Sequence, residues 1–180
     1  RVYELVRGAS GDNIPYIMAY LLEGKNYYPP LASFLNIKYH YTDLTHPLPT
    51  EWGKKLPVRD MGLYVNDRYL PRFFLAGKYQ VVKDTSKVLG LMLSPYFVPA
   101  ERVFIEEEPE AAPAQADKIS GEVTVEKYTP DRVDLSVESD KDCFLVMSET
   151  YYPGWKAAID GKPARIYRAD YAFRSIVVPK

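Results

Sequence analysis

Aromatic and arginine side chains are concentrated between residues 148 and 180 of this sequence. Aromatic rings stack on the faces of sugars, and the arginine guanidinium binds carboxylates and phosphates through paired hydrogen bonds. Together they can form a surface that contacts a glycan, a glycolipid or a partner protein. The candidates for this contact are Tyr151, Tyr152, Arg165, Tyr167, Arg168, Tyr171 and Arg174. The alternative is that the aromatics fill a β-sandwich core and the arginine stems cover its rim.

Other residue types that support catalysis or metal binding are few. His40, Asp43 and His46 are close in sequence, but His46 lies past a turn and the segment offers no fourth ligand. Cys143 opens an apolar run, where a cysteine is usually a buried and unreactive side chain. The glycine patterns that bind phosphate are missing from the sequence. We therefore expect no catalytic residue, no cofactor and no metal site in this chain.

The composition is that of an ordinary folded protein. Of the 180 residues, 47% are apolar and 26% are charged, and the net charge of -1 lacks the basic excess typical of nucleic-acid binders. A single cysteine excludes an intrachain disulfide. The most membrane-like run, residues 13–22, is much shorter than the roughly 20 apolar residues that cross a bilayer. Nucleic acid is thus not an expected partner.

One segment, residues 106–117, differs in composition from the rest of the chain. It contains five acidic residues, four alanines and two prolines, and no large apolar side chain. A segment of this kind cannot contribute to a core, so we interpret residues 107–117 as a linker. The expected domains are then a mixed α+β lobe at 1–106 and a β-sandwich lobe at 118–180.

The first lobe shows both helical and strand patterns. Apolar residues recur at helical spacing over 13–22, and residues 29–36 predict a second, short helix. Strands are predicted near 37–42, 62–66, 72–76, 79–83 and 102–107, and Asp84 is placed to cap a helix that begins at residue 85. The strand, helix, strand order over 79–106 is typical of a parallel crossover.

The second lobe has the alternation of a half-buried sheet. Residues 132–139 alternate apolar and polar side chains, residues 143–149 are apolar on both faces, and residues 171–179 predict a further strand. Asp160-Gly161 is a strong hairpin signal between two extended runs. Trp155 follows a Pro-Gly turn beside the apolar strand, so we expect its indole to be largely buried. The overall fold class is therefore α+β, mostly β, with an antiparallel sandwich.

The same C-terminal stretch resembles a known family. "SETYYPGWKAAIDGKPARIYRADYAFRSIVVP" is similar to the C-terminal signature of the YfhO-type bacterial membrane proteins, and "LASFLNIKYHYT" and "YLPRFFLAGKYQVVKD" resemble two of its upstream segments. Members of this family are similar to multi-spanning glycosyltransferases that use lipid-linked sugar donors. The resemblance implies that this chain is the extracytoplasmic C-terminal region of such a protein, truncated within its sandwich, and that the catalytic acid lies elsewhere in the parent protein.

The expected function follows from both arguments. We expect a soluble domain on the extracytoplasmic face of the bacterial cytoplasmic membrane, anchored through the parent chain, which contacts the membrane-embedded part of that chain. It would act as a non-catalytic accessory module that binds a glycan or a lipid-linked sugar. The alternative is a purely structural or protein-docking domain without affinity for sugars.

Overall fold

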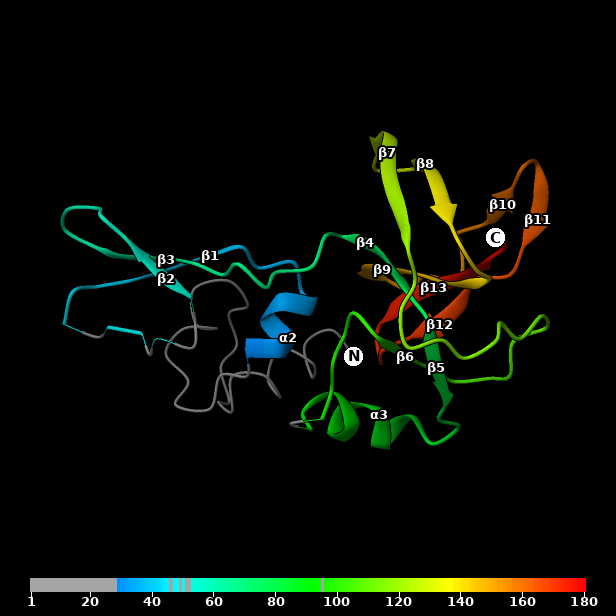
Figure 1. Ribbon diagram of the computed structural model, residues 1–180, viewed down its shortest axis with the longest axis horizontal. Coiled ribbons are helices and arrows are strands. Elements are labelled where there is room, and N and C mark those ends of the chain that lie inside the picture. The colour runs from blue at the N-terminus through cyan, green and yellow to red at the C-terminus, as the bar shows by residue number, and fades with distance from the viewer. Residues whose placement is uncertain (1–28, 46, 49, 51–52, 95) are drawn as a thin grey trace.

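The computed structural model describes residues 29–45, 47, 48, 50, 53–94 and 96–180, and this part of the chain is mostly β structure (Figure 1). The predicted α+β, mostly β class is confirmed. The helix predicted at 13–22 lies outside the described residues. In chain order the elements are α2 (Pro29–Phe34), β1 (Tyr39–Thr42), β2 (Lys54–Leu56), β3 (Gly62–Val65), β4 (Phe73–Ala76), β5 (Lys78–Val81), α3 (Thr85–Met92), β6 (Arg102–Ile105), β7 (Gly121–Thr129), β8 (Arg132–Ser139), β9 (Cys143–Thr150), β10 (Ala157–Ile159), β11 (Lys162–Ala164), β12 (Tyr167–Ala169) and β13 (Phe173–Val178).

A six-stranded sheet forms the centre of the molecule, in the order β4-β9-β13-β12-β6-β5. Its neighbouring strands are antiparallel except for β5 and β6, which are parallel and joined through α3. The predicted crossover is therefore confirmed. The Asp84 side chain caps α3 by accepting a hydrogen bond from the Ser86 amide at 3.2 Å, as its position before the apolar run predicts.

The sheet curls, because its two edge strands are consecutive parts of one bent segment. Only Gly77 separates β4, which pairs with β9, from β5, which pairs with β6. A Cβ atom at Gly77 would lie 2.5 Å from the carbonyl oxygen of Ala116, so the close approach of these two segments requires a glycine.

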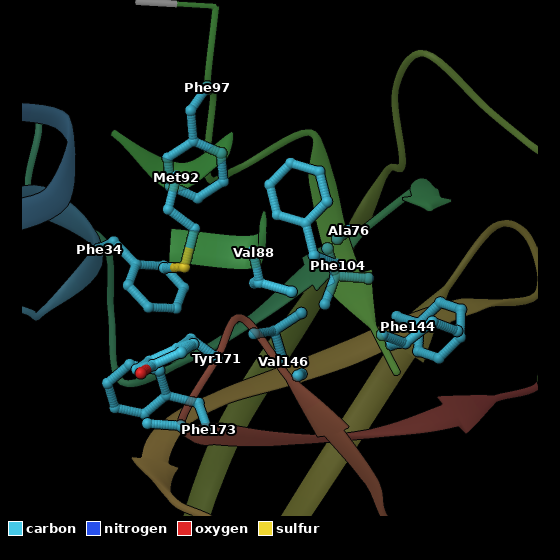
Figure 2. Close-up of a cluster of buried hydrophobic side chains, with 14 of the residues drawn as sticks. Phe34, Ala76, Val88, Met92, Phe97, Phe104, Phe144, Val146, Tyr171 and Phe173 are labelled. Carbon is cyan, nitrogen blue, oxygen red and sulfur yellow. The ribbon is translucent and has the colours of Figure 1, made fainter. Parts of the chain in front are cut away.

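The acidic segment at 107–117 does not separate two sheets. Strands β4, β5 and β6 precede it and β9, β12 and β13 follow it, yet all six belong to the same sheet. The larger hydrophobic cluster likewise joins Phe34 and Ala76 from one side of the segment to Phe144 and Phe173 from the other (Figure 2). The chain before the segment and the chain after it therefore share one core.

Each face of the central sheet carries a separate hydrophobic cluster. The β9 residues Phe144 and Val146 contribute to the cluster under α2 and α3, whereas Cys143, Leu145 and Met147 contribute to the cluster on the opposite face. This alternation follows from the two-residue period of a strand that is buried on both faces. The apolar run at 143–149 predicted such a strand, and the structure confirms it.

Two hairpins cover the second face of the sheet. The β7–β8 hairpin supplies Val123, Val133, Leu135 and Val137 to the second cluster, and the β10–β11 hairpin supplies Ala157 and Ile159. The β10–β11 turn has positive φ angles at Asp160 (50°) and Gly161 (77°), as a type I′ turn requires. The hairpin predicted at this Asp-Gly pair is confirmed.

A smaller antiparallel sheet, in the order β1-β3-β2, lies apart from the hairpins (Figure 1). Asn66, which follows β3, ties this sheet to the segment after α2. Its side-chain amide donates hydrogen bonds to the Ser33 hydroxyl and to the Ile37 carbonyl, both at 3.0 Å.

Candidate functional site

The structure places the seven predicted contact residues in different surroundings. Tyr167 and Tyr171 are 2% and 9% exposed and belong to the cluster under α2 and α3. The hydroxyl group of Tyr167 accepts a hydrogen bond from the Glu110 amide at 3.0 Å. These two rings therefore act as core side chains and present no free face to a ligand.

The arginines of this stretch contact the acidic segment. Arg165 binds Glu107 at 2.7 Å and Glu110 at 2.8 Å, and Arg168 lies 3.5 Å from Glu106. The guanidinium of Arg168 also lies over the Tyr151 ring, 4.7 Å from its centroid. The segment that sequence analysis interpreted as a linker is thus bound along β12 by ion pairs.

Tyr151 and Tyr152 line a depression beside the β10–β11 hairpin. Its volume is about 380 Å³, and Trp155, Pro163 and Ile166 complete its wall. Tyr152 is 68% exposed, which leaves most of its ring open to solvent. This is where the aromatic residues of the predicted contact surface do come together.

Arg174 lies on the opposite face from Tyr171, next to Trp155. Its guanidinium carbon is 4.1 Å from the centroid of the indole ring, within the range of a cation–π contact. One nitrogen donates a hydrogen bond to Glu149, while Nε and Nη1 have no partner among the described residues. Arg174 is 3% exposed, so this charge is almost completely shielded from water. Trp155 itself is partly buried, less than the sequence analysis expects.

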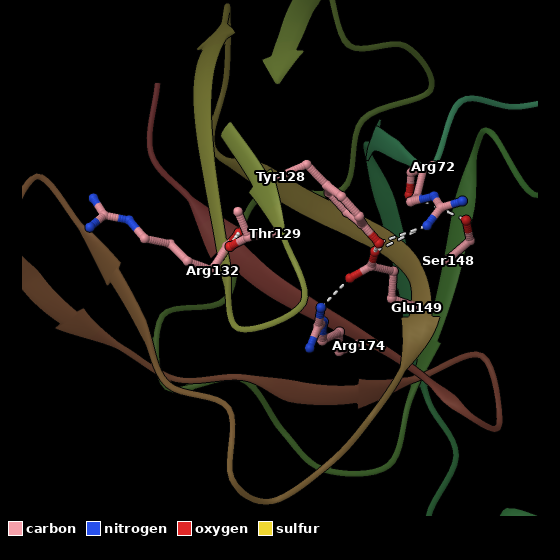
Figure 3. Close-up of polar contacts among 7 residues, drawn as sticks. All are labelled: Arg72, Tyr128, Thr129, Arg132, Ser148, Glu149 and Arg174. Carbon is pink, nitrogen blue, oxygen red and sulfur yellow. Dashed lines mark hydrogen bonds and ion pairs between the residues drawn. The ribbon is translucent and has the colours of Figure 1, made fainter. Parts of the chain in front are cut away.

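Glu149 connects Arg174 to two further residues (Figure 3). The Tyr128 hydroxyl donates a hydrogen bond to Glu149 and accepts one from Arg72 at 2.7 Å. The bond to Glu149 raises the pKa of Tyr128 above its usual range, because the neighbouring carboxylate disfavours a phenolate. Arg72 lies 3.5 Å from the same carboxylate. We call this group, Arg72, Tyr128, Glu149, Trp155 and Arg174, the Trp155 site.

The Trp155 site lines a polar depression of about 390 Å³. Two arginines and one glutamate leave it with a net charge of +1. Of its five members, only Arg174 is among the contact residues predicted from the sequence, which placed Trp155 in the core. Arg72, Tyr128 and Glu149 are each single polar residues at strand ends, and the sequence carries no signal that brings them together.

A larger groove begins at Arg174 and Trp155 and runs between the two hairpins. Its volume is about 880 Å³. Strands β8 and β10 form its sides, and its floor is apolar, with Leu145, Met147, Ile176 and Val178. We call it the hairpin groove. Trp155 lines this groove, the polar depression and the Tyr151–Tyr152 depression, and is therefore common to all three.

The other chemically interesting residues have structural surroundings. His40 is 3% exposed, and its burial lowers the pKa of its imidazole. His46 lies outside the described residues. Burial raises the pKa of the Cys143 thiol, which opposes thiolate formation. Within the described ranges, no three histidine, cysteine or acidic side chains are grouped as metal ligands would be.

Comparisons with family models, curated proteins and solved structures found no match to this chain. In the part of the chain that the structure describes, no helix has the length and apolar character of a membrane span. The fold and the site define a class of protein. It is a mostly β domain with one curled sheet, two covering hairpins and an arginine–tryptophan site between them.

Proposed function

We propose that this chain is a non-catalytic glycan-binding module and that the Trp155 site is its binding site. The observation that carries the proposal is the contact between the buried Arg174 guanidinium and the partly exposed Trp155 indole. The Glu149 carboxylate, the Tyr128 hydroxyl and the Arg72 guanidinium lie beside this pair. An aromatic ring supplies an apolar face for a sugar ring, and charged side chains around it bind the hydroxyl groups.

The size and polarity of the site agree with this function. The depression of about 390 Å³ lies within the range of pockets that hold small ligands. Arg72 is half exposed, with a side-chain exposure of 49%, so its guanidinium can reach a ligand from the rim. Glu149 is held between Arg72, Tyr128 and Arg174, which fixes its carboxylate without a loop that must close.

The resemblance to YfhO-type proteins supports a wider proposal about context. The module would belong to a glycosyltransferase-like membrane protein and lie on the extracytoplasmic face of the bacterial cytoplasmic membrane. It would hold a glycan or a lipid-linked sugar near the membrane-embedded part of the same protein. We assign it no catalytic residue and no cofactor.

Titration of the chain with bacterial glycans and polyprenyl-phosphate sugars, followed by NMR of backbone amides, tests the proposal. We expect shifts at Glu149, Trp155 and Arg174. Trp155→Ala should abolish them, whereas Tyr41→Ala, which removes a 60% exposed ring from β1, should not. The alternative is a structural or protein-docking domain. Shifts that are absent in the wild type, or that persist in Trp155→Ala, would favour that alternative.

A further inference from the structure

The hairpin groove separates the two hairpins that cover the central sheet. Strand β8 lines one side of it along its whole length, and β10 lines the other. Between them, the floor consists of the apolar side chains Leu145, Met147, Ile176 and Val178 of β9 and β13. The layer of strands over this face of the sheet is therefore interrupted, and the interruption lies over an apolar surface.

Both strands that border the groove have a free edge there. Among the described strands, β8 pairs only with β7, and β10 pairs only with β11. Neither β7 nor β11 lines the groove, so the unpaired edges of β8 and β10 are the ones that face it. A free strand edge presents alternating N–H and C=O groups, which are a template for another strand.

The free edges decide which kind of molecule fits. An alkyl chain or another apolar ligand would cover the floor but leave the N–H and C=O groups of β8 shielded without partners, which is costly. An extended peptide satisfies these groups and at the same time places every second side chain on the floor. Only the peptide therefore matches both the apolar floor and the polar edges.

The charge at one end of the groove gives the peptide a direction. Val133, near the start of β8, pairs with Tyr128 of the Trp155 site, whereas Ser139, at the end of β8, lies 3.4 Å from Cys143. The groove thus begins at Arg174, whose Nε and Nη1 atoms have no partner in the described part of the chain, and ends near Cys143. A strand antiparallel to β8 runs toward Arg174, so a carboxylate near its C-terminal end can accept hydrogen bonds from the Nε and Nη1 atoms that the ion pair with Glu149 leaves unused.

We propose that the hairpin groove binds an extended segment of a partner protein by strand addition to β8. The segment has alternating aliphatic residues and an acidic residue near its C-terminal end. β8 contains eight residues, and at 3.4 Å per residue its edge spans about 27 Å, enough for a strand of about eight residues. This inference does not rest on glycan binding, although the groove shares Trp155 and Arg174 with the Trp155 site.

The test uses the whole chain and a synthetic octapeptide that alternates threonine and valine and ends in glutamate. Backbone NMR should show shifts along 132–139 and 157–160, and amide hydrogen exchange along β8 should slow by about tenfold or more at saturation. Peptide in which alternate amides are N-methylated keeps the side chains but loses the hydrogen bonds. It should bind at least about tenfold more weakly, since two lost hydrogen bonds suffice for that factor.

Two controls separate the parts of the proposal. Replacing the terminal glutamate by lysine should weaken binding if Arg174 receives the carboxylate, and equal binding would refute that role. In the chain, Leu135→Lys on the groove side should weaken binding more than Val125→Lys on β7, which does not line the groove. Shifts elsewhere than the groove, or equal affinity of the N-methylated and unmodified peptides, would overturn strand addition.

Other occupants give different results in the same experiment. Concentration-dependent shifts along β8 without peptide would identify a second copy of the chain as the occupant. Dodecyl phosphate that shifts the same amides, and that the peptide cannot displace, would identify an aliphatic chain. Either outcome would refute a partner peptide.

Discussion

The carboxyl group of Asp170 is buried in the turn between β12 and β13, and it makes folding depend on pH. Its Oδ1 atom accepts a hydrogen bond from the Phe104 amide at 2.9 Å, but Oδ2 has no partner among the described residues. The residue is 1% exposed. Burial raises the pKa of Asp170 to about 8, because the charged form loses its hydration and gains one hydrogen bond in return.

The sign of the effect follows from the two protonation states. An aspartate in an unfolded chain titrates near a pKa of about 3.9. Between that value and about 8, the folded chain holds a proton that the unfolded chain has released. The free energy of unfolding therefore falls as pH rises, by about 1.4 kcal/mol per pH unit. The contribution of Asp170 to stability is fully present only below its pKa in the unfolded chain. From about pH 5 to pH 7, the loss from this group is about 2.7 kcal/mol.

Asp170→Asn removes this proton linkage. We expect urea unfolding at pH 5, 6 and 7 to give a slope against pH that is less negative than that of the wild type by about 1.4 kcal/mol per unit. The control is Asp160→Asn, which removes a carboxylate from an exposed turn that also has positive φ. Equal slopes for the wild type and Asp170→Asn would refute a buried, protonated Asp170.

Two further predictions concern the hairpin turn and the buried ion pair. Gly161→Ala should lower the free energy of unfolding by about 1 kcal/mol because of its φ of 77°, whereas Gly90→Ala, where a Cβ meets equally open space inside α3, should raise it by up to about 1 kcal/mol. Thermal melts of the two variants check this, and melting temperatures that shift in the same direction in both variants would contradict the reasoning. Glu149→Gln should cost about 3 kcal/mol, because it leaves the buried charge of Arg174 without a partner, and adding Arg174→Met should restore part of the loss. Urea titration of the single and double variants checks this, and a double variant less stable than Glu149→Gln would argue against it.

The strands could be predicted largely because local patterns determine them. Asp160-Gly161 has few alternatives to a tight turn, and the apolar run at 143–149 fits a strand with two buried faces. Pairing over long distances has no such signal. β4 pairs with β9 across about 70 intervening residues, and the sequence of neither strand identifies the other as its partner.

The candidate site shows the same limit. Arg72 and Glu149 are 77 residues apart and Glu149 and Arg174 are 25 apart. The aromatic density of residues 151–171 indicated this region as a candidate contact surface, but it did not separate core from surface. Tyr167 and Tyr171 lie in β12 and in the turn after it and are buried, whereas Tyr152 lies between β9 and β10 and is exposed, and the sequence alone does not distinguish these tyrosines.

The bent segment formed by β4, Gly77 and β5 has a consequence for the order in which the chain folds. β5 can pair early, since its partner β6 follows through a short helical crossover. β4 must wait for β9, which is made much later, and β9 in turn borders β13, near the end of the sequence. During synthesis, then, one half of this segment is paired while the other half stays open until the last strands emerge. We therefore expect closure of the sheet to be a late and slow step, which only a chain complete through β13 can finish.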